Sequence, residues 1–212
     1  MRILSTIELS SGQMFVKLIL TIVFFSLCGC FTTHLNNYEN TPGLDTLVSS
    51  SEHALTLNVV NPSPNVSRGF QFLLGILPTS RVFTEDLEAI VTSRLQFHAG
   101  SAGYGLTSSD KSPHTQPTIM VNISDATING YDLLFIRRPS AYVTLEGTLF
   151  NHSGVVTGCV ESGSYSELSK FAFESDLTRA LESAADQAAQ KLTKCLGIGT
   201  DLDAQHAVTG AQ

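Results

Sequence analysis

Residues 142–165, YVTLEGTLFNHSGVVTGCVESGSY, are the stretch from which the fold is best predicted. Apolar and polar residues alternate from Tyr142 to Phe150, which is the period of a strand with one buried face. Residues 151–154 are rich in turn formers, and a second extended run follows over residues 155–165. The stretch therefore predicts two antiparallel strands joined by a short turn.

A third strand is predicted just before this pair, over residues 117–131. Alternate apolar side chains share one face up to Ile123, and the apolar phase then shifts at Ala126. Such a shift predicts a β-bulge near Ser124 and Asp125. The three strands together make an antiparallel meander. Its first connection, near residues 133–139, ends in a basic tip.

Two helices and one further strand complete the predicted fold. Residues 55–60 alternate and form the first strand, and helical spacing of leucine and isoleucine predicts a helix over residues 85–97 that Thr84 caps. An apolar stripe with many alanines predicts a closing helix that ends before Gly197. We expect an α+β fold, with a small, mixed, mostly antiparallel sheet of about four strands and two helices packed on one face.

The N-terminal stretch MFVKLILTIVFFSLCGC, residues 14–30, has the features of an export signal. One lysine precedes a short apolar run, which is too short to span a bilayer. The run closes on Leu-Cys-Gly-Cys, which resembles a bacterial lipobox. That resemblance implies cleavage before Cys30 and acylation of Cys30. An ordinary signal peptide and a membrane-anchor helix are the alternatives.

The same stretch organises the rest of the chain. Glu8 lies ahead of the apolar run, where a signal peptide carries positive charge, so we expect translation to start at Met14. Residues 1–30 are then an N-terminal extension and a lipoprotein signal peptide. Residues 31–53 are polar and predict a flexible tether, residues 54–198 an α+β domain, and residues 199–212 a disordered tail.

Charge argues against one class of partner. The chain has 12 basic and 19 acidic residues; without Arg2, Lys17 and Glu8 the part from Cys30 keeps 10 and 18, a net charge of about −8. Nucleic-acid binding is not expected, because phosphate contacts need clustered basic residues. Three Asn-x-Ser sequences, at Asn65, Asn122 and Asn151, would be glycosylation sites if the chain were a secreted eukaryotic protein.

Besides the acylated Cys30, two cysteines remain after the predicted cleavage, Cys159 and Cys195. In an exported domain this predicts one disulfide, since the periplasm is oxidising. If Val156 and Val160 face the core, however, the period of a strand turns Cys159 to the opposite side. A bulge at Gly158 would then be needed to bring the two thiols together.

Two apolar segments are candidate contact surfaces for lipid or for a partner protein. One lies within residues 69–78, and the other joins apolar residues to two arginines within residues 133–138. Burial of the first segment as a core strand is the alternative. The candidate contact residues are Phe70, Phe72, Leu73, Leu74, Leu133, Phe135, Arg137 and Arg138.

The sequence carries no recognisable catalytic motif. The histidines have no metal-ligand spacing, and no nucleophile elbow, phosphate-binding loop or zinc-protease motif occurs. We therefore expect no catalytic residues, no metal and no cofactor.

The order tether, strand, helix, meander and helix resembles small outer-membrane lipoproteins of the lipopolysaccharide-assembly (LptE-like) and YajG types. The lipobox and the closing helix, with its Ala-Ala pairs and KLTKCL ending at residues 191–196, contribute to the resemblance, which spans about residues 54–197. It implies two helices on one face of a small mixed sheet. It also implies an anchor in the outer membrane, because Phe31 rather than Asp follows Cys30.

The expected function is that of a lipid-anchored envelope lipoprotein facing the periplasm. It would be a non-catalytic accessory or binding subunit in outer-membrane assembly or transport, with an envelope protein as its partner. The alternatives are a lipid- or glycolipid-binding protein, with a groove between helices and sheet, and an envelope hydrolase.

Overall fold

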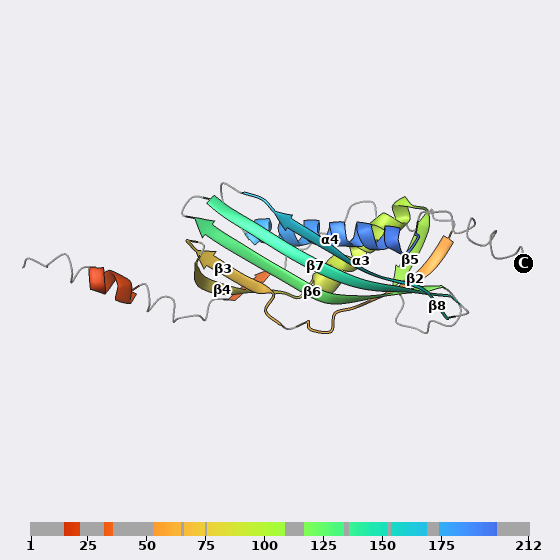
Figure 1. Ribbon diagram of the computed structural model, residues 1–212, viewed down its shortest axis with the longest axis horizontal. Helices are drawn as coiled ribbons and strands as arrows, with labels where there is room; N and C mark the ends of the chain where they lie inside the picture. The colour runs from red at the N-terminus through yellow and green to blue at the C-terminus, as the bar shows by residue number, and fades with distance from the viewer. Residues whose placement is uncertain are drawn as a thin grey trace, which may run out of the picture.

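The computed structural model describes residues 15–21, 32–35, 53–64, 66–74, 76–108, 117–133, 136–151, 154–168 and 174–198. Within these residues one mixed sheet has eight strands, and Figure 1 shows both long helices on one of its faces. A short helix covers residues 15–21, and no helix among the described residues is long and apolar enough to cross a membrane. The elements are β1 (Thr32–Leu35), β2 (His53–Val60), β3 (Gly69–Leu73), β4 (Leu77–Thr84), α3 (Leu87–Ser101), β5 (Tyr104–Ser108), β6 (Thr118–Leu133), β7 (Ile136–Asn151), β8 (Gly154–Ser166) and α4 (Glu174–Cys195).

Strand β6 is the centre of the sheet. Its one edge pairs antiparallel with β7 along the whole strand, and β8 pairs with β7 beyond it. Its other edge is shared: β2 runs parallel to the first part, and β3 runs parallel to the last part. Strand β5 extends the sheet beyond β2, while β4 and then β1 extend it beyond β3. The sheet therefore has two separate wings on the same edge of β6.

The expectation of about four strands was wrong, because the described part of the chain holds eight. Strands β2, β6, β7 and β8 correspond to the predicted ones; β1, β3, β4 and β5 form the two wings. Four of the seven described pairings are parallel; the meander and the β3–β4 hairpin are antiparallel. Strands β1 and β5 pair only in parallel with partners far apart in the chain, so no shared turn marks them in the sequence. Strands β3 and β4 are neighbours, but the apolar run over residues 69–78 has no clear period from which two strands could be recognised.

The predicted meander is present, with two details worth noting. The register of β6 against β7 shifts between Ile123 and Asp125, so the predicted bulge is confirmed. Strand β7 begins at Ile136, earlier than expected. Arg137 and Arg138 therefore lie within a strand rather than at a basic tip.

Helix α4 lies unusually close to β7 and β8. A Cβ atom built on Gly163 would be 1.9 Å from the carbonyl oxygen of Ala184, and one on Gly147 would be 2.8 Å from the side chain of Leu192. Ala184 and Ala188 are fully buried. Small residues on both surfaces therefore permit a contact that larger side chains would prevent.

Helix α3 begins two residues later than predicted. Thr84 is the last residue of β4, and Asp86 occupies the N-cap position without a side-chain cap. Helix α3 packs beside α4, and two polar contacts join them: Arg94 to Glu182 at 3.3 Å and His98 to Asp186 at 2.9 Å.

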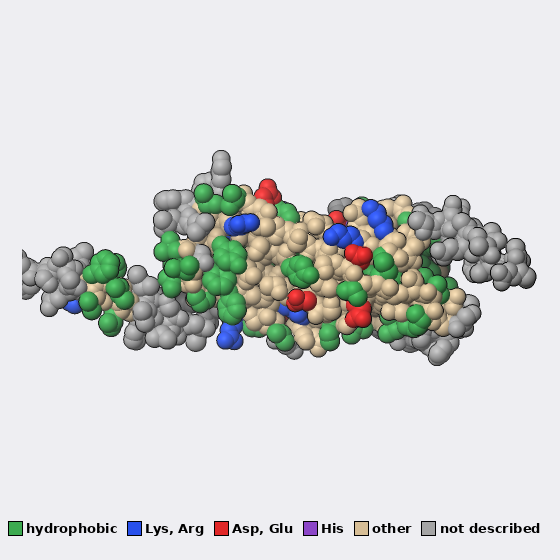
Figure 2. Space-filling view, viewed as in Figure 1, with side chains coloured by type: hydrophobic (Ala, Val, Ile, Leu, Met, Phe, Trp, Pro, Cys, Tyr) green, Lys and Arg blue, Asp and Glu red, His purple; other side chains and the backbone are tan. Residues whose placement is uncertain are grey.

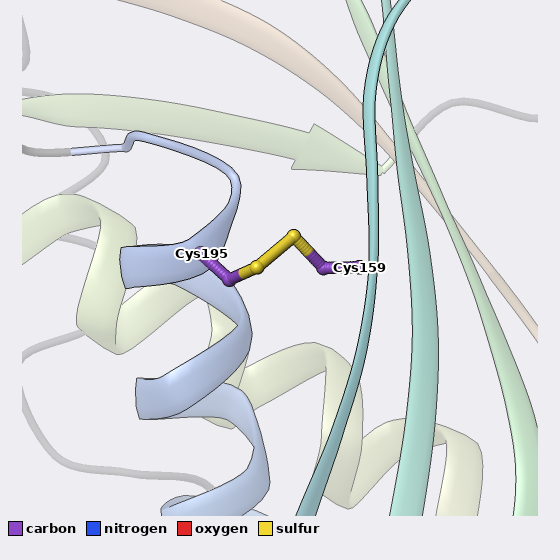
Figure 3. Close-up of a disulfide and its surroundings, with 2 residues drawn as sticks. All are labelled: Cys159 and Cys195. Carbon is purple, nitrogen blue, oxygen red and sulfur yellow. A yellow bond between two sulfur atoms is a disulfide. The ribbon is translucent and has the colours of Figure 1, made fainter.

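The predicted disulfide between Cys159 and Cys195 is formed, with the two Cα atoms 6.2 Å apart (Figure 3). It needs no bulge at Gly158, because Val160 is 64% exposed on the open face of the sheet and Cys159 faces the helix. The placement of the valines in the core was therefore the wrong alternative. A bond across 36 residues stabilises the fold by about 3–4 kcal/mol in the loop-entropy model.

The close approach of α4 makes Gly163 a sensitive position. We expect Gly163→Ala to lower the free energy of unfolding by about 2 kcal/mol or more, because the new methyl group meets helix backbone that cannot move alone. Gly158→Ala on the same strand is the matched control, since its Cβ would have no atom nearer than 3.8 Å. Urea unfolding of both variants measures the difference. Equal stabilities would contradict the packing described here.

Candidate functional site

The two predicted contact segments meet at one end of the sheet. In the register of β3 with β6, Phe72 lies opposite Tyr131 and Leu73 opposite Asp132; in that of β6 with β7, Asp132 lies opposite Arg137. The β3–β4 hairpin and the start of β7 therefore reach the same end, where Figure 2 shows hydrophobic side chains gathered. The exposed members, here called the apolar end, are Phe70 (39% exposed), Leu73 (43%), Leu74 (46%), Ile76 (76%) and Ile136 (45%).

Aromatic rings of β3 and β6 stack against one another next to the apolar end. The rings of Phe72 and Tyr131 lie 5.1 Å apart at 8°, and the ring of Phe70 is tilted against that of Phe72 at 6.0 Å. Cross-strand aromatic pairs of this kind stabilise neighbouring strands. Phe72 is half-buried, so it holds β3 to β6 and leaves the contact surface to its neighbours.

The turn at the tip of the β3–β4 hairpin holds a leucine in an unfavourable conformation. Leu74 has a φ of 53°, a left-handed value that suits glycine or asparagine and is uncommon for a bulky residue. A residue other than glycine in this conformation costs about 1–2 kcal/mol of folding free energy. Burial compensates this cost only in part, since 46% of Leu74 remains exposed.

Arginines border the apolar end. Arg81 is exposed on β4 opposite Phe70, and Arg138 is exposed and donates a hydrogen bond from Nε to the Ser166 hydroxyl at 2.8 Å. Arg137 is half-buried and forms an ion pair with Asp132. Because Asp132 compensates Arg137, the exposed positive charge of this end comes from Arg81 and Arg138.

The acidic residue Glu167 follows β8, on the edge of the sheet opposite to β4. The Tyr165 hydroxyl donates a hydrogen bond to the Glu167 carboxylate, and this hydrogen bond raises the pKa of Tyr165. Leu168, which follows, is 66% exposed. The negative charge of Glu167 is thus partly satisfied by a neutral donor and lies on the β8 side, away from β4.

Not every predicted contact residue can be placed. Cys30 and Phe135 lie outside the described residues, and so does the side chain of Leu133, whose backbone ends β6. Ile76 and Ile136 lie within the two predicted contact segments but were not named among the individual candidate residues, although both are prominent members of the apolar end.

The lipid-binding groove that the alternative function would need between helices and sheet is not present where α4 meets Gly147 and Gly163. At Gly163 the strand lies against the backbone of α4, and at Gly147 it lies against the side chain of Leu192, so at these two positions there is no space for an acyl chain between α4 and the sheet. The described residues also contain no group of three or more side chains arranged to hold a metal ion.

Comparison with known proteins assigns no family. No family model matches the chain, and no curated protein sequence matches it. Solved structures do resemble it. A Xanthomonas campestris protein described by the family model DUF330 has 12% identity and a TM-score of 0.46, covering 86% of this chain and all of that one.

Two further structures are described as lipoproteins. A minor lipoprotein from Acinetobacter baumannii has 10% identity and a TM-score of 0.40, covering 70% of this chain and 93% of its own. The rare lipoprotein B from Shewanella oneidensis has 8% identity and a TM-score of 0.32, covering 73% and 98%. With TM-scores below 0.5, these likenesses assign no activity to this chain.

The strained turn predicts an unusual substitution result. Leu74→Asn should leave the free energy of unfolding unchanged or raise it by up to about 1 kcal/mol, because asparagine tolerates a positive φ and little apolar contact is lost. Leu77→Asn, on the neighbouring strand and partly buried, is the control that should destabilise. Thermal unfolding of both compares them. A marked loss of stability in Leu74→Asn would show that the fold needs this leucine.

Proposed function

We propose that this chain is a lipoprotein of the bacterial cell envelope, acylated at Cys30, anchored in the outer membrane and facing the periplasm. In this proposal it is a non-catalytic accessory or binding subunit of a system that assembles or transports envelope material. The acyl chains supply its location. A second attachment, through the folded domain, supplies its specificity.

The observation that carries the proposal is the apolar end. Soluble proteins rarely gather exposed apolar side chains at one place unless something covers them. Here segments about 60 residues apart in the chain, around Leu74 and around Ile136, are brought together for it. A domain whose prominent surface feature is a contact surface, whether for lipid or for a protein, fits an accessory protein that works at a membrane.

Two further observations support an exported, anchored protein. The disulfide joins Cys159 and Cys195, the two cysteines that would remain besides the acylated Cys30, and such bonds persist in oxidising compartments. Strand β1 begins at Thr32, only two residues after Cys30, so the folded sheet starts next to the anchor.

The alternatives are less favoured by the geometry. A lipid- or glycolipid-binding protein would need a groove, and the helix above β7 and β8 lies too close to those strands to provide one there. An envelope hydrolase would need a cleft with converging catalytic groups. The ion pair between Arg94 and Glu182 and the hydrogen bond between His98 and Asp186 join α3 to α4, so they serve the packing of the two helices.

The anchor is tested by intact mass. The chain extracted from membranes should have the mass of residues 30–212 plus acyl groups, and the Cys30→Ala variant should lack the acyl mass. An unmodified chain in the membrane extract would refute the anchor. Sugar mass on Asn65, Asn122 or Asn151 would refute the bacterial assignment altogether.

The accessory role is tested by purification of the acylated chain from gently solubilised envelopes. One envelope protein should co-purify in constant proportion, and Cys30→Ala should lose it, because the unanchored chain no longer stays at the membrane. Purification of the acylated chain alone, in several mild detergents, would contradict an accessory role.

A further inference from the structure

The direction of β1 determines which end of the domain faces the anchor. Strand β1 runs parallel to β4, with Thr32 opposite Arg81 and Leu35 opposite Thr84. Strand β4 in turn runs away from the hairpin tip, from Leu77 to Thr84. The first residue of β1 is therefore the one nearest the tip, and the chain enters the sheet from the side of the apolar end.

The length of the chain limits how far the anchor lies from this end. Cys30 precedes Thr32 by two residues, and a residue spans at most about 3.6 Å, so their Cα atoms are within about 7 Å of each other. Leu77 lies four strand residues from Arg81, about 13 Å, toward the tip. An acylated Cys30 holds its own backbone at the membrane surface, so the hairpin tip is placed at or below the level of the headgroups unless the domain lies on its side.

The surface of this end suits a membrane interface. Leucine, isoleucine and phenylalanine side chains are exposed at the tip, and Arg81, which lies beside Thr32, is placed to meet phosphate groups. This arrangement contrasts with the acidic net charge of the chain. Figure 2 shows positively charged side chains beside the apolar cluster. The apolar residues lie at the tip and the basic residue Arg81 lies farther from it. A lipid leaflet has the same order, with acyl chains inside and charged headgroups at the surface.

We propose that the apolar end of the sheet dips into the lipid leaflet that holds the acylated Cys30, so that the domain stands end-on to the membrane, with the last residues of β7 and of α4 at the end that points into the periplasm. This inference rests on the proposed acylation and names the component that the apolar end contacts. Because the acyl chains already retain the protein, the contact sets the orientation of the domain rather than its location. The strained, exposed Leu74 is explained, since its side chain is used in lipid.

The test places a fluorescent label at the tip of the acylated full chain. Ile76→Cys supplies a free thiol for a polarity-sensitive dye, because Cys159 and Cys195 are bonded to each other. Val160→Cys, 64% exposed on the open face away from the tip, is the matched control. The protein is reconstituted in vesicles of phosphatidylethanolamine and phosphatidylglycerol that carry nitroxide-labelled lipid.

We expect the dye at position 76 to shift its emission to shorter wavelength and to be quenched by the nitroxides, while the dye at position 160 stays accessible to aqueous iodide. Adding Leu74→Asn should return the dye at position 76 toward water without lowering the unfolding temperature. Equal iodide quenching at both positions would overturn the inference. So would shielding of position 76 in native envelopes but not in protein-free vesicles, which would identify a protein as the occupant.

These outcomes separate the two proposals. A chain without acyl mass would remove the anchor and the inference together. An acylated chain whose dye at position 76 remains in water would overturn only the end-on orientation and leave the anchored accessory protein standing.

Discussion

The contact between α4 and the strands β7 and β8 is the constraint on which the rest of the structure depends. It is possible because Gly147 and Gly163 meet the helix where any side chain would collide with Leu192 or with the backbone at Ala184. The disulfide from Cys159 to α4 holds the same layer together. With one face of the sheet closed in this way, interior space for a ligand is excluded beneath α4, and binding is left to the outer surfaces of the domain.

The length of β6 decides where those surfaces are. A strand of 16 residues is long enough for β2 and β3 to share one of its edges, so the sheet divides into two wings. The wing of β3, β4 and β1 carries the apolar hairpin to one end, next to the start of β7. It also brings Thr32 to the tip side of Arg81. The topology that assembles the contact surface thus also determines where the N-terminal segment enters the domain.

The meander could be predicted because its strands pair with neighbours that are close in the chain. Residues 142–165 alternate and turn back on each other, so β7 and β8 were recognisable, and the phase shift at Ala126 located the bulge in β6. Strands β1 and β5 pair only in parallel with distant segments, which leaves no local signal. The side of Cys159 was ambiguous for a different reason: beneath a helix this close only small residues fit, so the buried face of β8 at Gly163 is less apolar than its exposed face at Val160.

The sequence by itself determined what local pattern and composition encode. These properties are an N-terminal stretch with the features of an export signal and an end that resembles a lipobox, the closing helix, the meander, the pair of cysteines and the two apolar segments. Only the tertiary structure decided that these two segments form one surface and that the chain enters the sheet beside it. The physical reason is that strand pairing over long distances is set by the combined burial of all elements against α3 and α4. Which residues become neighbours at the end of the sheet is a property of the whole packed layer, and no single stretch of the chain contains it.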